Sequence, residues 1–267
     1  MTTTERWNPP ARTLIGMVHV DALPGTPRSS LDPREIAKRA ADEARQLVDA
    51  GFDAILVENM HDLPYLRREV GPEIVAAMTR AVDAVVTSSA GLPVGVQVLA
   101  GANHAALSIA HAAGARFIRA EGFAYAAVAD EGILDAADAG GLLRFRRTIG
   151  AESIAVWSDV RKKHSAHALT ADLVLADLVS GTHFMGPDAV IITGSHTGQA
   201  VSAHDLDAAR NASPLPVAVG SGATPESLPG LLERCDAVIV GSAIKHEGHW
   251  SNPIDPDRAR AFVEARG

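Results

Sequence analysis

The chain has 267 residues, of which 47% are hydrophobic and 21% charged, and its formal net charge is −8. This size and composition are typical of one soluble domain with a sizeable core, and the acidic balance argues against a nucleic-acid-binding protein, which relies on a basic face. The single cysteine, Cys235, excludes an intramolecular disulfide and suits a reducing compartment. No apolar run reaches the roughly 18 residues of a membrane span, and no signal peptide is evident at the N-terminus, so we expect a cytoplasmic protein.

Short apolar runs rich in β-branched residues recur eight times and predict eight strands. Alanine-rich segments with helical spacing lie between them. A buried strand followed by a helix, repeated along the chain, is typical of parallel strands joined by crossover helices, and eight such units predict a closed (β/α)8 TIM barrel. The predicted strands are 14–20, 54–59, 93–100, 117–123, 154–160, 189–195, 216–222 and 237–243.

Residues 1–13 are expected to form an extended N-terminal arm, and residues 14–267 a single barrel domain. Asp32 and Pro33 predict the start of the first helix, as an N-cap followed by proline at the first helical position. The connections 21–30 and 124–134 exceed a minimal turn, and we expect both at the barrel mouth as binding or covering loops. The predicted helices are 33–50, 73–89, 103–113, 135–149, 168–180, 204–211, 224–234 and 255–265.

Turns of small residues follow the last three predicted strands. Glycine lets the backbone approach an anion and direct N–H groups at it, and in phosphate-binding barrels the phosphate lies after strands seven and eight. The alternative is that these are tight strand-to-helix turns that need glycine for their backbone alone. Two such turns at the appropriate strands favour a phosphorylated small-molecule ligand, bound by Gly194, Ser195, Gly220, Ser221, Gly222, Gly241 and Ser242.

Charged side chains occur at the ends of the earlier strands, where the chemistry of such barrels takes place. A carboxylate in an apolar strand is costly to bury unless it is paired or used. Glu58 and Asp159 are therefore predicted to act as acid and base, with His19, Glu121 and Lys163 as further catalytic candidates.

Two alternatives for these carboxylates stay open. They could form salt bridges inside the barrel, for which Arg119 is an available partner. A divalent metal ion held by Glu58 and Asp159 together with a substrate phosphate is the other option, and no other cofactor is predicted. His164 and His167 have loose metal-ligand spacing but no second cluster beside them, which favours a solvated basic loop over zinc.

The chain resembles the BtpA/SgcQ family over about residues 14–263. The resemblance implies a phosphate-binding TIM barrel of the ribulose-phosphate-binding type. One branch of that family is named for a role in photosystem I biogenesis, and another is regarded as a candidate enzyme for nucleoside or phosphosugar compounds. The motifs that carry the resemblance are IGMVHVDALPGTPR (15–28), DAILVENMHDLPY (53–65), DVRKKHSAH (159–167), ITGSHTG (192–198), VGSGATP (219–225) and GSAIKHEGHWSNPID (241–255).

The chain departs from the family pattern at two strand ends. Relatives tend to carry Asn-Asp after the third strand, where this chain has AGAN at 100–103, and Asn and Val near the end of the fourth, where it has AEGF at 120–123. Both positions lie at the expected mouth, so the departures favour a shifted substrate and weaken any role transferred to Gln97 or Glu121.

These observations favour an enzyme that acts on a phosphorylated sugar or nucleotide-like metabolite by acid–base chemistry. Isomerase, lyase and N-glycosidic-bond reactions all use carboxylate pairs, so the residues do not choose among them. The alternatives are a non-catalytic biogenesis or assembly factor and a regulator that binds a phosphorylated metabolite. Barrels of this kind also predict a homo-oligomer.

Overall fold

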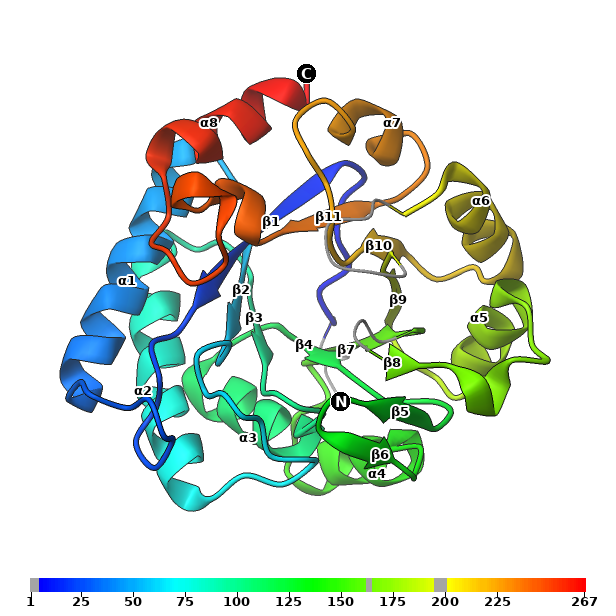
Figure 1. The fold of residues 1–267 in the computed structure, drawn as a ribbon, viewed down its shortest axis with the longest axis horizontal. Coiled ribbons are helices and arrows are strands. Elements are labelled where there is room, and N and C mark those ends of the chain that lie inside the picture. The colour runs from blue at the N-terminus through cyan, green and yellow to red at the C-terminus, as the bar shows by residue number, and fades with distance from the viewer. Residues whose placement is uncertain (1–4, 162–164, 195–200) are drawn as a thin grey trace.

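The computed structural model, which describes residues 5–161, 165–194 and 201–267, contains eight parallel strands closed into a barrel (Figure 1). Each strand pairs with its neighbour around the ring, and β11 pairs with β1 to complete it. The predicted TIM barrel is therefore confirmed. In order around the ring, the strands are β1 (Thr13–His19), β2 (Ala54–Glu58), β3 (Val94–Gln97), β4 (Phe117–Ala120), β7 (Ala155–Asp159), β9 (Ala189–Ile192), β10 (Val217–Val219) and β11 (Ala237–Val240).

Helices surround the barrel (Figure 1). The first begins as predicted, because Asp32 accepts a hydrogen bond from the Arg34 backbone N–H and Pro33 follows it. It ends at Gly51, whose left-handed backbone (φ 93°) favours glycine. The helices are α1 (Pro33–Ala50), α2 (Pro72–Ser88), α3 (Asn103–Ala113), α4 (Ala139–Thr148), α5 (Leu175–Phe184), α6 (Ala203–Ala212), α7 (Leu228–Leu232) and α8 (Pro256–Ala265).

Three predicted helices have wrong boundaries because local hydrogen bonds compete with the helix. The segment before α4 is not helical, since the N–H groups of Asp138 and Ala139 donate to the carbonyls of Gly122 and Phe123. The region 168–174 forms a short 3-10 turn followed by a loop, and α5 starts at Leu175. At the start of α7, the Thr224 and Ser227 side chains bond to each other's backbone N–H, which forms a turn in place of the first helical turn.

A small antiparallel sheet, which the sequence analysis did not predict, lies outside the barrel. It contains β5 (Ala127–Ala129) and β6 (Gly132–Leu134) from the long connection after β4, and β8 (Ser165–Ala166) from the connection after β7. The sheet joins two connections that leave the carboxyl ends of neighbouring barrel strands. Its strands are only two or three residues long, too short for a periodic pattern to indicate them.

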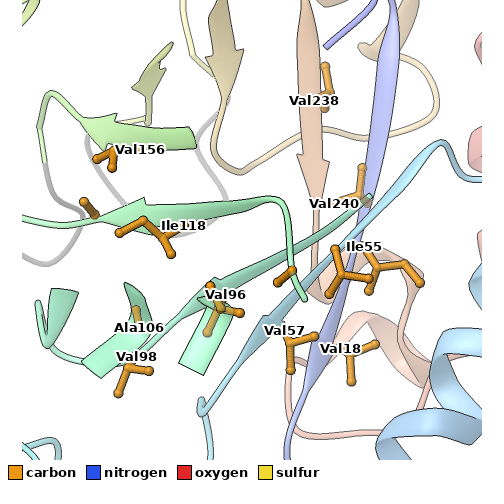
Figure 2. Close-up of a cluster of buried hydrophobic side chains, with 14 of the residues drawn as sticks. Val18, Ile55, Val57, Val96, Val98, Ala106, Ile118, Val156, Val238 and Val240 are labelled. Carbon is orange, nitrogen blue, oxygen red and sulfur yellow. The ribbon is translucent and has the colours of Figure 1, made fainter. Parts of the chain in front are cut away.

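Two hydrophobic layers form the core. Alternate residues of each strand point outward and pack beneath the helices, as Val18, Val57, Val96 and Val240 do in Figure 2. The remaining residues point into the barrel, where they form a second cluster of small and large side chains. That inner cluster consists of Ile15, Met17, Ala54, Leu56, Phe117, Ala155, Trp157, Ala189, Ile191, Ala218, Ala237 and Ile239.

Trp7 of the N-terminal arm covers the inner cluster at the amino ends of the strands. The indole of Trp7 stacks on Trp157 with ring centroids 5.1 Å apart and an interplanar angle of 5°, and it lies 4.8 Å from the ring of Phe117. Because Trp7 precedes β1, it enters the barrel from the amino ends of the strands. The opposite, carboxyl end is left for polar side chains. Within the described ranges, no helix has the length and apolar character needed to cross a membrane.

Candidate functional site

Strand alternation brings the polar candidates together at the carboxyl end of the barrel. His19 follows the inward-facing Met17, Glu58 follows Leu56, and Asp159 follows Trp157, each two residues further along its strand. Residues two apart on a strand share a face, so all three side chains point inward. The strand register places His19 beside Glu58 and Glu58 beside Gln97. All of these side chains are buried at the mouth.

His19 is held in one tautomer. Its Nδ1 lies 2.8 Å from the carbonyl oxygen of Trp250, which can only accept, so Nδ1 carries the proton and Nε2 carries a lone pair. Nε2 lies 3.8 Å from Glu58 Oε2. Burial and, after it, the charge of Lys245 lower the pKa of His19 to about 3. The imidazole is therefore neutral at physiological pH, with its basic nitrogen towards Glu58.

Asp159 forms a two-point ion pair with Arg119. Arg119 Nε donates to one carboxylate oxygen at 2.8 Å and Nη2 to the other at 2.9 Å. Burial alone would lower the pKa of the guanidinium, but Asp159 overrides this and raises the pKa above its usual range. The salt-bridge alternative therefore describes Asp159. An acid–base role for this carboxylate stays a prediction, and it would have to operate with Arg119 in contact.

Glu121 lies just beyond the end of β4 and beside Gln97. Gln97 Nε2 donates to Glu121 Oε1 at 3.4 Å, and Asn103 Nδ2 donates to the Glu121 carbonyl at 2.9 Å. Asn103 also donates to Asp138 at 2.8 Å, which ties the start of α3 to the segment before α4. The side chain of Glu121 is thus placed at the mouth, although the residue lies outside the regular strand.

The predicted phosphate turns lie on neighbouring strands, β10 and β11, and each touches a charged or basic side chain. A Cβ placed on Gly220 would lie 2.7 Å from Ile191 Cγ2 and 3.1 Å from Arg119 Nη2, so only glycine fits there. A Cβ on Gly241 would lie 3.5 Å from His19 Nε2. Gly222 has a left-handed backbone, with φ of 77°.

The remaining members of the predicted set lie partly within the described residues and partly outside them. The buried Oγ of Ser221 has no hydrogen-bond partner among the described residues. Ser242 begins the short turn after β11, and Gly194 is buried just after β9. Ser195 and Lys163 lie outside the described residues.

Sequence reasoning missed a buried ion pair that supports this side of the mouth. Lys245 is fully buried, and its Nζ donates to Glu43 Oε2 on α1 at 2.7 Å. Glu43 Oε1 accepts from the Ile254 N–H at 3.1 Å. The pair fastens both ends of the loop that carries Trp250, the residue that orients His19. The available signal was a lysine in the run AIK, directly after the turn that follows β11.

A second buried network ties three rim connections together. Asn59 accepts from the Leu99 N–H at 2.7 Å and donates to Asp62 at 2.8 Å. Asp62 in turn accepts from the Leu23 N–H at 2.8 Å. The connections that follow β1, β2 and β3 are therefore joined. The loop 21–30, expected as a binding loop, is anchored at Leu23 by these bonds.

A divalent metal ion at Glu58 and Asp159 stays a prediction. The described ranges contain no group of three or more His, Cys, Asp or Glu side chains arranged to hold one. Both Asp159 oxygens already accept from Arg119, so a divalent ion at Glu58 and Asp159 would have to bind beside a guanidinium.

The sequence of the chain matches the model of the BtpA family over residues 10–266. The chain belongs to the BtpA family. This BtpA-family member is 42% identical over 255 residues to "Uncharacterized protein F13E9.13, mitochondrial" of Caenorhabditis elegans, covering 94% of the chain and 91% of the relative. It is 37% identical over 254 residues to "Photosystem I biogenesis protein BtpA" of Synechocystis, covering 94% of the chain and 87% of that relative.

The barrel of this BtpA-family chain is also similar to solved structures of enzymes. The crystal structure of a 3-hexulose-6-phosphate synthase superposes with a TM-score of 0.58 at 15% identity and covers 95% of this chain and 99% of that one. At this identity the likeness shows the TIM-barrel fold alone.

Proposed function

We propose that this chain is an enzyme that acts on a phosphorylated sugar or nucleotide-like metabolite by acid–base chemistry at the barrel mouth. The observation that carries the proposal is that Gly241 lies next to His19, since a Cβ added to Gly241 would lie 3.5 Å from His19 Nε2. The small-residue turns of β10 and β11 and the His19–Glu58 pair of β1 and β2 thus lie within reach of one small ligand.

The turns supply the features of an anion site. Gly220 and Gly241 lack side chains where the two strands end, and the Ser221 Oγ is a buried hydroxyl with no hydrogen-bond partner in the described part of the chain. Arg119 Nη1 lies 3.5 Å from the Gly220 carbonyl, which places a guanidinium N–H donor, paired with Asp159, next to the same turn. In barrels that bind phosphate, the group lies after these two strands. The proposal therefore anchors the phosphate at the turns of β10 and β11.

The chemistry is assigned to His19 and Glu58. Nε2 of the neutral imidazole can accept a proton from a substrate, while Trp250 holds the opposite nitrogen. Glu58 Oε2, 3.8 Å away, stabilises the imidazolium that forms or exchanges a proton itself. Arg119 provides positive charge for an oxyanion that develops at the mouth. Isomerase, lyase and N-glycosidic chemistry all fit this set.

We also propose a cytoplasmic homo-oligomer. The single cysteine suits a reducing compartment, and homo-oligomers are the common assembly of soluble proteins. The Caenorhabditis elegans relative is named as a mitochondrial protein.

The phosphate anchor predicts that inorganic phosphate and ribose 5-phosphate raise the melting temperature of the protein. Gly241→Ala should weaken both by about tenfold in Kd, because the new methyl lies 3.2 Å from Met17 Sδ and faces His19 in the space assigned to the anion. Gly230→Ala is the matched control, since a Cβ there meets nothing within 4 Å. Failure of phosphate to stabilise the wild type, or unchanged binding by Gly241→Ala, would show that the anchor is misplaced.

A second candidate function is that of an assembly factor, favoured by the Synechocystis relative, which is named as a photosystem I biogenesis protein. Glu58→Gln separates the two, because it keeps the shape of the side chain and removes its charge. The enzyme proposal expects this variant, folded, to lose about 100-fold in turnover and to fail to complement a deletion strain. Glu35→Gln on the exposed face of α1 should complement fully. Full complementation by Glu58→Gln would favour the assembly factor.

A further inference from the structure

Residues 246–253, which come after β11 and include Trp250, form a closed loop that we call the Trp250 loop. An antiparallel bridge between the flanking residues Lys245 and Ile254 joins its two ends. Inside the loop, the Gly248 N–H donates to the Lys245 carbonyl at 2.9 Å. The backbone of the loop is thus bonded to its own base, so a shift of the base also moves Trp250.

Glu43 on α1 bonds to both ends of this loop. Its Oε2 accepts from Lys245 Nζ at 2.7 Å, and its Oε1 accepts from the Ile254 N–H at 3.1 Å. The lysine is fully buried, Ile254 is buried, and the side chain of Glu43 is 16% exposed. The two oxygens of one carboxylate therefore hold the base of the Trp250 loop against an outer helix.

The position of the Trp250 carbonyl decides where the proton of His19 lies. Nδ1 donates to this carbonyl at 2.8 Å, and Nε2 lies 3.8 Å from Glu58 Oε2. An ionised carboxylate is a stronger acceptor than a carbonyl, so Glu58 favours the opposite tautomer, with the proton on Nε2. In that tautomer Nε2 has no lone pair and cannot accept a proton from a substrate. His19 can therefore act as a base only while the Trp250 carbonyl stays in place.

Building on the proposed function, in which His19 is the base, we propose that Glu43 is a positioning residue that fixes the His19 tautomer through its bond to the Ile254 N–H. Glu43 lies on α1, outside the ring of strands, and acts through the Trp250 loop rather than on the substrate. A buried N–H without an acceptor is costly, so the loop base should shift to find another partner when this bond is lost. The Trp250 carbonyl then moves away from Nδ1, and the proton moves to Nε2.

Two double variants isolate the bond to Ile254. In Glu43→Gln, Lys245→Met the amide oxygen still accepts from the Ile254 N–H, whereas Glu43→Met, Lys245→Met leaves no acceptor there. Both variants lack the buried ion pair and so have the same charge, and replacing a whole buried pair is often nearly neutral for folding. The Met variant should shift the ratio of the two His19 tautomers by about tenfold towards the proton on Nε2, and the Gln variant should keep the wild-type ratio.

NMR of the isotope-labelled full chain measures this ratio, because the chemical shift of each ring nitrogen depends on whether it carries a proton. Spectra are recorded at about pH 8, where histidine side chains are neutral. His19→Gln identifies the His19 signals by their loss. Glu35→Met is the control on the same helix, since the exposed side chain of Glu35 pairs only with Arg39 among the described contacts, and it should keep the wild-type ratio.

An unchanged ratio in Glu43→Met, Lys245→Met, or an equal shift in both double variants, would overturn the positioning role and leave the proposed function standing. Glu43→Leu, Lys245→Met also removes the acceptor and takes the place of the Met variant if that variant does not fold. A wild-type His19 with its proton on Nε2 would overturn both proposals, because the base would then lack its lone pair.

Discussion

Arg119→Met is expected to lower the free energy of unfolding by about 3–5 kcal/mol. The guanidinium makes two bonds to Asp159 at 2.8 and 2.9 Å, and both side chains are buried. Removing the cation leaves the carboxylate buried without its counter-charge, which costs more than the pair itself contributes. Urea unfolding at pH 7, followed by circular dichroism, measures the difference.

The double variant Arg119→Met, Asp159→Leu provides the control. Replacing a whole buried ion pair with apolar side chains is often nearly neutral, so the double variant should recover most of the stability that the single variant loses. A double variant as unstable as Arg119→Met would mean that the pair holds the barrel together through its geometry, and not through compensation of charge.

Acidification is expected to destabilise the protein through His19. The folded-state pKa of about 3 lies below the ordinary 6.5, so the unfolded chain binds the proton more readily. The stability that His19 provides is therefore complete above about pH 6.5 and is lost as the pH falls towards 3. Between pH 7 and 4 this loss amounts to about 3 kcal/mol. Unfolding free energies measured across that range test it.

His19→Gln should flatten this part of the pH profile, since glutamine does not titrate. His204→Gln is the matched control, because the side chain of His204 is 92% exposed and the variant should keep the wild-type slope. Equal slopes for the wild type and His19→Gln would show that a proton enters the folded site without penalty, for example one shared with Glu58 across the 3.8 Å contact.

The sequence predicted the barrel well because its signal is local. Each barrel strand is a short apolar run, and four of them, β1, β2, β3 and β7, end in a polar residue. A period of two residues then decides which side chains face inward, and this is how His19, Glu58 and Asp159 could be assigned to one mouth. The starts of α4, α5 and α7 were predicted less well. Hydrogen bonds to the carbonyls of Gly122 and Phe123 replace helical bonds before α4, and bonds between Thr224 and Ser227 replace them before α7.

Pairing between residues far apart in the chain could not be predicted from the sequence. Whether Asp159 is a free carboxylate or the partner of Arg119 depends on the stagger of strands around the ring, and so does the contact of Gly241 with His19. Lys245 forms an ion pair with Glu43, which lies 202 residues away in the chain, and no local sequence pattern predicts this pairing. The protonated nitrogen of His19 is likewise set by a carbonyl 231 residues away.

The sequence by itself therefore determined the fold, the side of each strand that faces inward and the end of the barrel where polar groups gather, because these follow from short-range periodicity. The tertiary structure alone decided which charges are neutralised and which nitrogen of His19 is basic. These properties depend on distance and burial, which exist only after the barrel has closed.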